Sequence, residues 1–365
     1  MTITLICNPL IFIKMIPLKF IKMIMIREGF TLLLFLNFML LIVVFAGLVK
    51  GADWFVDGSA AVAKKLHVSS VIIGLTIVAM GTSAPELAVS TTAALKGSNE
   101  IAFSNVVGSN IFNLMVVLGV CAVIHSVPVD AIILKRDFPF SIGAMVLTFL
   151  ATGFGAVISG KLFESSSAGR LGLDMSEDIG KVTRTLSISF IVIFAVYIFL
   201  LIYDAKKNPT PAEEINDITP GKCVMLILVG LALIVAGGQA VVYSSQYIAR
   251  SFGMTETLIG LTVVALGTSL PELVTSIVAA KKGETGLAIG NVVGSNIFNN
   301  LLILGVSSTI RPIAVNRASI FDMVVLILMS ILIMLLVFKK KKLERSGGVL
   351  MLLLYSAYIV FAAIR

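Results

Sequence analysis

Long apolar stretches separated by short polar turns run through almost the whole sequence. A helix that spans a membrane needs about 20 apolar residues, and ten stretches meet this length. The first and the sixth are long enough to be tilted in a bilayer. The predicted spans are 34–62, 69–95, 101–125, 138–160, 185–203, 222–249, 255–280, 287–310, 318–338 and 347–364. The pattern therefore predicts an all-α, polytopic membrane protein.

The composition leaves no room for a large soluble domain. The chain is 58% apolar and 13% charged, whereas a soluble domain is nearer half apolar and a quarter charged. We interpret the net charge of +8 as charge in cytoplasmic loops and not as a nucleic-acid surface. The three cysteines are scattered, which disfavours a disulfide framework or a zinc site. We expect a multi-pass protein of the cell membrane that contacts the lipid bilayer and no nucleic acid.

The chain divides into two halves of five spans each. Residues 1–33 are predicted to be an N-terminal extension, because lysine and arginine interrupt their apolar run. The halves are 34–203 and 222–365, and a linker with several prolines joins them at 204–221. Once the N-terminal tail is set aside, lysine and arginine are more frequent in the loops on the side of this linker. That bias places the linker in the cytoplasm and both chain termini outside.

Two short motifs occur once in each half. The hexapeptide GTSAPE at 81–86 returns as GTSLPE at 267–272, and the nonapeptide NVVGSNIFN occurs at 105–113 and at 291–299. Both pairs have an offset of 186 residues, and 28 of the 46 positions from Gly74 onward are identical. This is a long internal repeat and not a solenoid. Because five spans, an odd number, separate each element from its partner, the copies cross the membrane in opposite directions. Such inverted repeats bind their substrate near the bilayer midplane.

Each repeat places a carboxylate at membrane depth, where an ionisable group is costly and marks a functional site by default. Thr82 and Ser83 precede Glu86 by four and three residues, so the three side chains share a helix face. Pro85 lacks an N–H and is expected to kink this helix. Ser109 and Asn113, four residues apart, share a face of the third span. The second repeat supplies Thr268, Ser269, Glu272, Ser295 and Asn299 by the same logic.

All of these groups are hard oxygen donors. Ca²⁺ takes about six to eight oxygen ligands, Na⁺ accepts similar ones, and two glutamates neutralise one Ca²⁺. Soft metals would require sulfur or imidazole, and the repeated motifs contain neither. The sequence thus predicts a cage of oxygen atoms for a hard cation.

The paired motifs resemble those of the sodium/calcium exchanger family, prokaryotic type, within the cation/Ca²⁺ exchanger superfamily. The resemblance covers about residues 39–365. It implies ten transmembrane helices in two inverted five-helix repeats, alternating access, and exchange of Na⁺ for Ca²⁺ by a secondary antiporter that is not an enzyme. Ca²⁺ and Na⁺ would be cargo, no cofactor is expected, and we expect a monomer. The ion ligands that the resemblance implies are Ala79, Thr82, Ser83, Glu86, Ser109, Asn113, Ala265, Thr268, Ser269, Glu272, Ser295 and Asn299, the two alanines through their carbonyl groups.

One position departs from the family pattern. Many relatives carry Asp where this chain has Asn299, so the site has two carboxylates and not three. The departure bears on the ion stoichiometry and on any requirement for K⁺.

Three other functions fit parts of the pattern. In a Ca²⁺/H⁺ antiporter, Glu86 and Glu272 would bind protons, but the paired Thr-Ser hydroxyls favour Na⁺. An intramembrane hydrolase using Ser83 or Ser269 would need a neighbouring base, and histidine is absent from both repeats. A passive cation channel is less compatible with inverted repeats and broken helices, which are typical of transporters.

The first span also carries charges that the second half lacks. Lys50, Asp53 and Asp57 are spaced by three and four residues, and their repeat counterparts are uncharged. We interpret them as a local ion pair that offsets burial, with a role in the ion pathway as the second interpretation.

Overall fold

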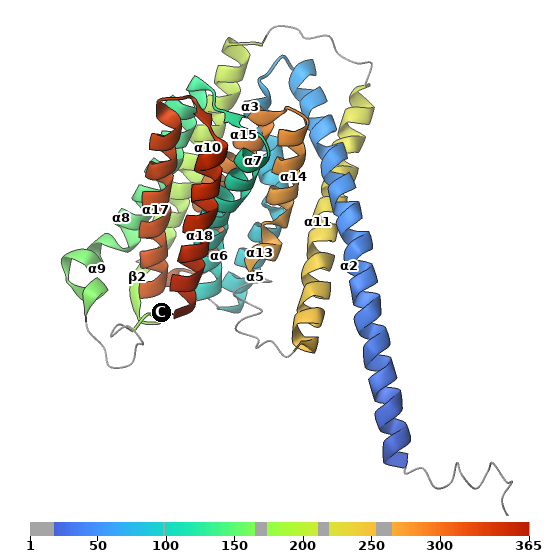
Figure 1. The fold of residues 1–365 in the computed structure, drawn as a ribbon. Helices are drawn as coiled ribbons and strands as arrows, with labels where there is room; N and C mark the ends of the chain where they lie inside the picture. Colours follow the sequence, from blue (N-terminus) through green and yellow to red (C-terminus); the bar gives the residue numbers. More distant parts are fainter. Residues whose placement is uncertain (1–17, 98, 165–173, 211–218, 253–264, 365) are drawn as a thin grey trace, which may run out of the picture.

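The computed structural model describes residues 18–97, 99–164, 174–210, 219–252 and 265–364. They form a bundle of helices with two short antiparallel sheets (Figure 1). The first half contains α2 (Leu18–Lys65), α3 (Ser70–Ile73), η1 (Gly74–Val78), α4 (Ala79–Thr82), α5 (Ala84–Lys96), α6 (Asn99–Phe112), η2 (Asn113–Val117), α7 (Leu118–Ile124), β1 (Val127–Pro128), η3 (Ile133–Asp137), α8 (Phe138–Thr152), α9 (Phe154–Ile158), η4 (Lys161–Phe163), β2 (Asp178–Val182) and α10 (Arg184–Lys207). The second half contains α11 (Pro220–Ser251), α13 (Ala265–Thr268), α14 (Leu270–Lys281), α15 (Thr285–Ile297), η6 (Phe298–Ile303), α16 (Leu304–Ile310), β3 (Ile313–Asn316), α17 (Arg317–Phe338), β4 (Lys342–Leu343) and α18 (Arg345–Ile364).

Within these ranges, seven helices are long and apolar enough to cross a membrane, or eight if the bent pair Ser70–Thr82 and Ala84–Lys96 is one span. The predicted span 138–160 is interrupted at Gly153, which separates α8 from α9. A Cβ atom at Gly153 would lie 2.9 Å from a methyl carbon of Ile320, so the break packs closely against α17. The predicted span 255–280 begins outside the described residues, as does part of the linker 204–221. The count of ten spans stays a prediction.

Residues 18–33 continue into the first span as part of one helix of 48 residues. At about 1.5 Å per residue, α2 is longer than the ~40–45 Å thickness of a whole bilayer. Its first part extends past the rest of the bundle (Figure 1). The predicted span 34–62 lies inside this helix, and residues 1–17 lie outside the part of the chain that the structure describes.

The helices that carry the repeated nonapeptide form the centre of the bundle. In the membrane-spanning segments Ile101–Ile124 and Thr285–Ile310, 72% and 94% of the most apolar window is buried. The corresponding share in α2 is 6%. Most polar residues of the nonapeptides are therefore placed in the protein interior, where another protein group, a bound water or an ion must satisfy them.

Helices α2 and α11 stand side by side at one edge of the bundle, where glycines bring their backbones into contact (Figure 1). A Cβ atom at Gly230 would lie 2.7 Å from the carbonyl oxygen of Gly51. Such small residues allow close helix packing in lipid, where no hydrophobic force holds helices together. The long first helix of one half thus packs directly against the long first helix of the other.

Glycines also bring the two repeats together at the centre. A Cβ atom at Gly290 of α15 would lie 2.6 Å from the carbonyl oxygen of Val71, and one at Gly294 would lie 2.7 Å from the Cα atom of Leu75. Only glycine allows α15 to approach α3 and η1 this closely. The approach places the second nonapeptide against the helix that carries the first hexapeptide.

The two small sheets each join one strand from each half. β1 pairs with β4, and β2 pairs with β3. The 22-residue helix α17 separates β3 from β4, which at about 1.5 Å per residue places the two sheets at opposite ends of a membrane-crossing helix. Residues 127 and 313, the first residues of β1 and β3, differ by the repeat offset. Repeat-related strands therefore lie at opposite ends of the bundle.

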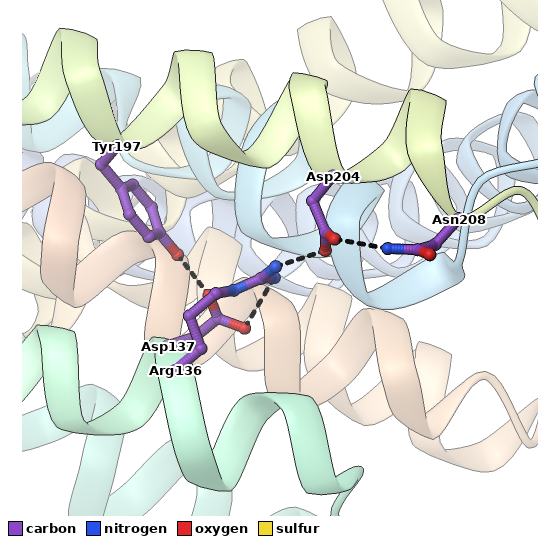
Figure 2. A network of polar contacts seen from close by, with 5 residues as sticks. All are labelled: Arg136, Asp137, Tyr197, Asp204 and Asn208. Atoms are coloured by element: carbon purple, nitrogen blue, oxygen red, sulfur yellow. Dashed lines mark hydrogen bonds and ion pairs between the residues drawn. The ribbon is translucent and has the colours of Figure 1, made fainter.

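A polar network attaches the start of the fourth predicted span to the end of the fifth (Figure 2). Arg136 donates from Nε to the fully buried Asp137 at 2.8 Å and also pairs with Asp204 of α10. Tyr197 donates its hydroxyl to Asp137 Oδ1 at 3.0 Å, and Asn208 donates to Asp204 at 2.7 Å. The buried carboxylate thus has both a cation and a hydroxyl donor, as a buried charge requires.

Candidate ion-binding site

Each hexapeptide interrupts its helix at the serine, Ser83 or Ser269, and the glutamate lies in the first turn of the helix that follows. The helix axis bends by 48° between Thr82 and Ala84, and α14 likewise begins directly after Ser269. Pro85 and Pro271 lie in the first turn of the helices that follow, where proline is tolerated because its missing N–H has no helical partner there. The kink predicted at Pro85 is confirmed. The break exposes the serine and glutamate side chains to the centre of the bundle.

The glutamate of each repeat accepts a hydrogen bond from the serine of the other repeat. Ser83 donates its hydroxyl to Glu272 Oε1 at 2.8 Å, and Ser269 donates to Glu86 Oε1 at 3.0 Å. Ser295 adds a longer contact to Glu272 Oε1 at 3.5 Å. All five side chains are buried. The two carboxylates therefore belong to one site that both halves of the chain build.

Several oxygen atoms of this site have no hydrogen-bond donor among the described residues. They are Glu86 Oε2, Glu272 Oε2, Asn113 Oδ1 and Asn299 Oδ1. Each of the four side chains is fully buried, and a buried carboxylate without a partner is strongly unfavourable. Neither glutamate forms an ion pair with any lysine or arginine in the described ranges. A hard cation would satisfy these oxygens, so the donor set fits Ca²⁺ or Na⁺ as cargo.

Asn113 and Asn299 lie in π-helical segments. Asn113 is the first residue of η2, and Asn299 is the second residue of η6. A π-helical turn inserts an extra residue and displaces the neighbouring backbone, and such turns are frequent at functional sites. A third π-helical turn, η1, ends directly before Ala79. The periodicity of the sequence did not predict any of these turns.

The remaining predicted ligands lie at or beside this cluster. The Ala79 carbonyl accepts the N–H of Ser83 at 3.0 Å and lies 3.4 Å from the hydroxyl of Thr82. Thr82 donates to Asn291 Oδ1 at 2.9 Å and contacts the carbonyl of Val78 at 3.1 Å. Ser109 and Thr268 are buried. Ala265 begins α13, and its side chain lies outside the described part.

Four asparagines of the nonapeptides that were not predicted as site residues hold the site together. Asn291 donates to Ser276 at 3.0 Å and to the backbone carbonyl of Glu272 at 3.4 Å. Its counterpart Asn105 makes the same two contacts in the first half, to Ser90 and to the carbonyl of Glu86. The other two are Asn110 and Asn296, which contact each other. The sequence offered one signal for these four residues, because the same asparagines occur in both copies of an otherwise apolar motif.

The charges of the first span form a larger cluster than the sequence predicted. Lys50 pairs with Asp53 at 2.6 Å, so the local ion pair is confirmed, but both side chains are partly exposed and the pair does not offset deep burial. Lys282, at the end of α14, pairs with Asp53 at 2.5 Å and with Asp57 at 2.6 Å. This contact across 225 residues attaches α2 to the turn between α14 and α15.

The arrangement can bind a small cation through oxygen atoms alone. In the ranges that the structure describes, no three His, Cys, Asp or Glu side chains group closely enough to hold a metal ion. Any ion here would be held by two carboxylates plus neutral oxygens from serine, threonine, asparagine and backbone groups. Neutral oxygen ligands bind a cation weakly. They are better suited to an ion that must be released than to a metal that stays bound.

Comparison with known proteins shows the family to which the chain belongs. Residues 36–203 and 222–364 match the family described as sodium/calcium exchanger protein. The chain belongs to the sodium/calcium exchanger family. A sodium/calcium exchanger from Methanosarcina acetivorans, MaX1, is 35% identical over 301 residues, which are 78% of this chain and 86% of that protein. Members of the sodium/calcium exchanger family are ion transporters and not catalytic enzymes.

The fold and the cellular location agree with this membership. The structure of a sodium-calcium exchanger, NCX_Mj, superimposes with a TM-score of 0.72 at 30% identity and covers 90% of this chain and 99% of that chain. An inner membrane protein of Escherichia coli, YrbG, is 31% identical over 280 residues, which are 75% of this chain and 79% of that protein. This member of the sodium/calcium exchanger family is a largely helical, multi-pass protein of the cell membrane and a cation/Ca²⁺ antiporter.

Proposed function

We propose that this protein exchanges Na⁺ for Ca²⁺ across the cell membrane by alternating access. Its ion site would comprise the twelve residues predicted from the motifs, with Glu86 and Glu272 as the two anionic ligands. Ca²⁺ and Na⁺ are its cargo, and no resident cofactor is required. Because both halves of the site come from one chain, we propose a monomer as the working unit.

The crossed serine–glutamate contacts are the observation that carries this proposal. Ser83 contacts Glu272 and Ser269 contacts Glu86, so a movement of one half relative to the other changes the surroundings of both carboxylates together. Four buried oxygens of the same cluster have no donor in the described residues. A cation held between two halves that can move is the arrangement that alternating access requires.

We further propose ten spans in two inverted five-helix repeats. Support comes from the seven candidate spans and the bent pair, from α8, and from α14, whose preceding residues lie outside the described ranges. Repeat-related strands at opposite ends of the bundle agree with an inverted arrangement.

The experiment that tests the proposal measures radiolabelled Ca²⁺ uptake into proteoliposomes loaded with Na⁺, with K⁺ or with acidic buffer. Na⁺-loaded vesicles diluted into Na⁺-free medium should accumulate Ca²⁺, and K⁺-loaded vesicles should not. Accumulation driven by internal acid instead of Na⁺ would favour the alternative, a Ca²⁺/H⁺ antiporter in which Glu86 and Glu272 bind protons. Ca²⁺ movement that only dissipates its own gradient would indicate a channel.

A further inference from the structure

Two fully buried asparagines, one in each nonapeptide, meet where α6 and α15 cross. Asn110 donates its amide Nδ2 to the backbone carbonyl of Asn296 at 3.4 Å, and Asn296 donates its Nδ2 to the carbonyl of Asn110 at 3.3 Å. These contacts join the two repeats at positions related by the repeat offset. Neither residue belongs to the proposed ligand set.

The contact with a carbonyl fixes which way the Asn110 amide faces. A carbonyl oxygen can only accept a hydrogen bond, so the group of Asn110 that faces Asn296 must be its NH₂. The Oδ1 atom of Asn110 then faces the other direction, toward the ligand residue Asn299. It accepts the Nδ2 of Asn299 at 3.0 Å.

The orientation of the Asn110 amide also determines the orientation of the Asn299 amide. Because its NH₂ group is held by Asn110 Oδ1, its own Oδ1 must point away from Asn110. That oxygen is buried and has no donor among the residues that the structure describes. It is therefore available to a cation, whereas the opposite orientation would present an NH₂ group, which cannot coordinate a cation.

We propose that Asn110 is a positioning residue that orients the Asn299 amide so that its oxygen, and not its nitrogen, faces the transported cation. The inference rests on the proposed function, because it assigns a role at the same ion site. It also makes Asn110 and Asn299 a matched pair. A carboxylate at position 299 has two equivalent oxygens and needs no such orientation, and one of them would face Asn110 Oδ1 across an unfavourable oxygen–oxygen contact.

A double-mutant cycle on the full-length purified protein tests this pairing. Asn110→Leu removes the orienting amide with little change in side-chain size, and Asn110→Ala serves as a second variant should the first fold poorly. The backbone carbonyl that accepts from Asn296 is retained in both. Each is measured alone and in the Asn299→Asp background, with Ca²⁺ affinity determined by calorimetric titration and folding checked by thermal melting.

In the presence of Asn299, loss of Asn110 should weaken Ca²⁺ binding by about tenfold, the value of one orienting hydrogen bond. In the Asn299→Asp background, loss of Asn110 should leave the Ca²⁺ affinity unchanged or raise it. The reason is that the substitution removes Asn110 Oδ1, which would face the new carboxylate. A merely structural role would produce the same loss in both backgrounds, and that result would overturn the inference.

Asn296→Leu is the matched control. Asn296 makes the equivalent contact with a backbone carbonyl, but among the described residues its Oδ1 accepts from no ligand amide. Its substitution should therefore show no dependence on the residue at position 299, and equal coupling of Asn296 and Asn110 to position 299 would contradict the assignment. A wild-type protein that binds no Ca²⁺ would overturn the proposed function itself, whereas Ca²⁺ binding with additive effects would overturn this inference alone.

Discussion

At the scale of single residues, two carboxylates share one buried site. Glu86→Gln or Glu272→Gln leaves one negative charge to face a divalent cation in a medium of low dielectric constant. We expect Ca²⁺ affinity to fall by roughly a hundredfold or more, as loss of one partner of a buried ion pair costs about 3 kcal/mol or more. Ca²⁺ titration of the purified variants measures this. The exposed Glu164→Gln is the control, and wild-type affinity in both site variants would refute the assigned site.

Asn299 should adjust ion choice without being required for transport. Its amide oxygen can coordinate a cation but carries no charge. Asn299→Asp places a third carboxylate close to Glu86 and Glu272, and mutual repulsion favours the protonated form of one of them. We expect retained Ca²⁺ exchange with a steeper pH dependence, and the same from Asn113→Asp at the repeat-related position. The measurement is the pH profile of Na⁺-driven Ca²⁺ uptake. A folded Asn299→Asp variant that is inactive at every pH would show that the amide N–H is indispensable.

At the scale of helices, long-range ion pairs hold the ends of elements together. Arg136 is the partner of opposite charge that the structure gives to the buried Asp137 in the described ranges, whereas Asp204 is partly exposed and accepts hydrogen bonds from both Arg136 and Asn208. Arg136→Ala should therefore destabilise the protein by about 3 kcal/mol, because it leaves an uncompensated buried charge. Asp204→Asn, the matched control, should cost about 1 kcal/mol or less. Thermal melting in detergent compares them, and equal losses would mean that Asp137 is not the group that Arg136 stabilises.

The attachment of α2 to the turn after α14 permits a similar test. Lys282→Met leaves Asp53 and Asp57 without their shared cation, although Lys50 still pairs with Asp53. The loss should be about 1 kcal/mol, since these groups are partly exposed and screened by solvent. Lys281→Met, at an exposed neighbouring position, should have no effect on the melting temperature. A Lys282 variant that melts like the wild type would mean that the pairs add no stability.

The elements differ in how far the sequence predicts them. Apolar length gave most of the spans, and the repeated Ser-x-Pro-Glu spacing predicted the break before Pro85, because both depend on local chemistry alone. The π-helical turns at Asn113 and Asn299 and the break at Gly153 depend on tertiary packing. The partner of Asp57 lies 225 residues away on another helix. The buried oxygens of the proposed site were predictable from residue type. The asparagines beside them contact backbone carbonyls, which a sequence pattern does not show.

At the scale of the whole molecule, exchange should move net charge. With two ionised glutamates, the site is neutral with one Ca²⁺ and carries one positive charge with three Na⁺, the ratio that the family resemblance suggests. A membrane potential clamped with valinomycin and K⁺ should therefore change the rate of Na⁺-driven Ca²⁺ uptake. A rate that is independent of voltage would argue for two Na⁺ or two H⁺ for each Ca²⁺.

We propose that one oxygen cage, built by both halves of the chain, holds either Ca²⁺ or Na⁺ but not both. The decisive measurement is an equilibrium Ca²⁺ titration of the purified wild-type protein at increasing Na⁺ concentration, with ionic strength held constant by choline. We expect the apparent Kd for Ca²⁺ to rise with Na⁺ more steeply than in direct proportion, because more than one Na⁺ replaces each Ca²⁺. A Kd for Ca²⁺ that does not change with Na⁺ would contradict it.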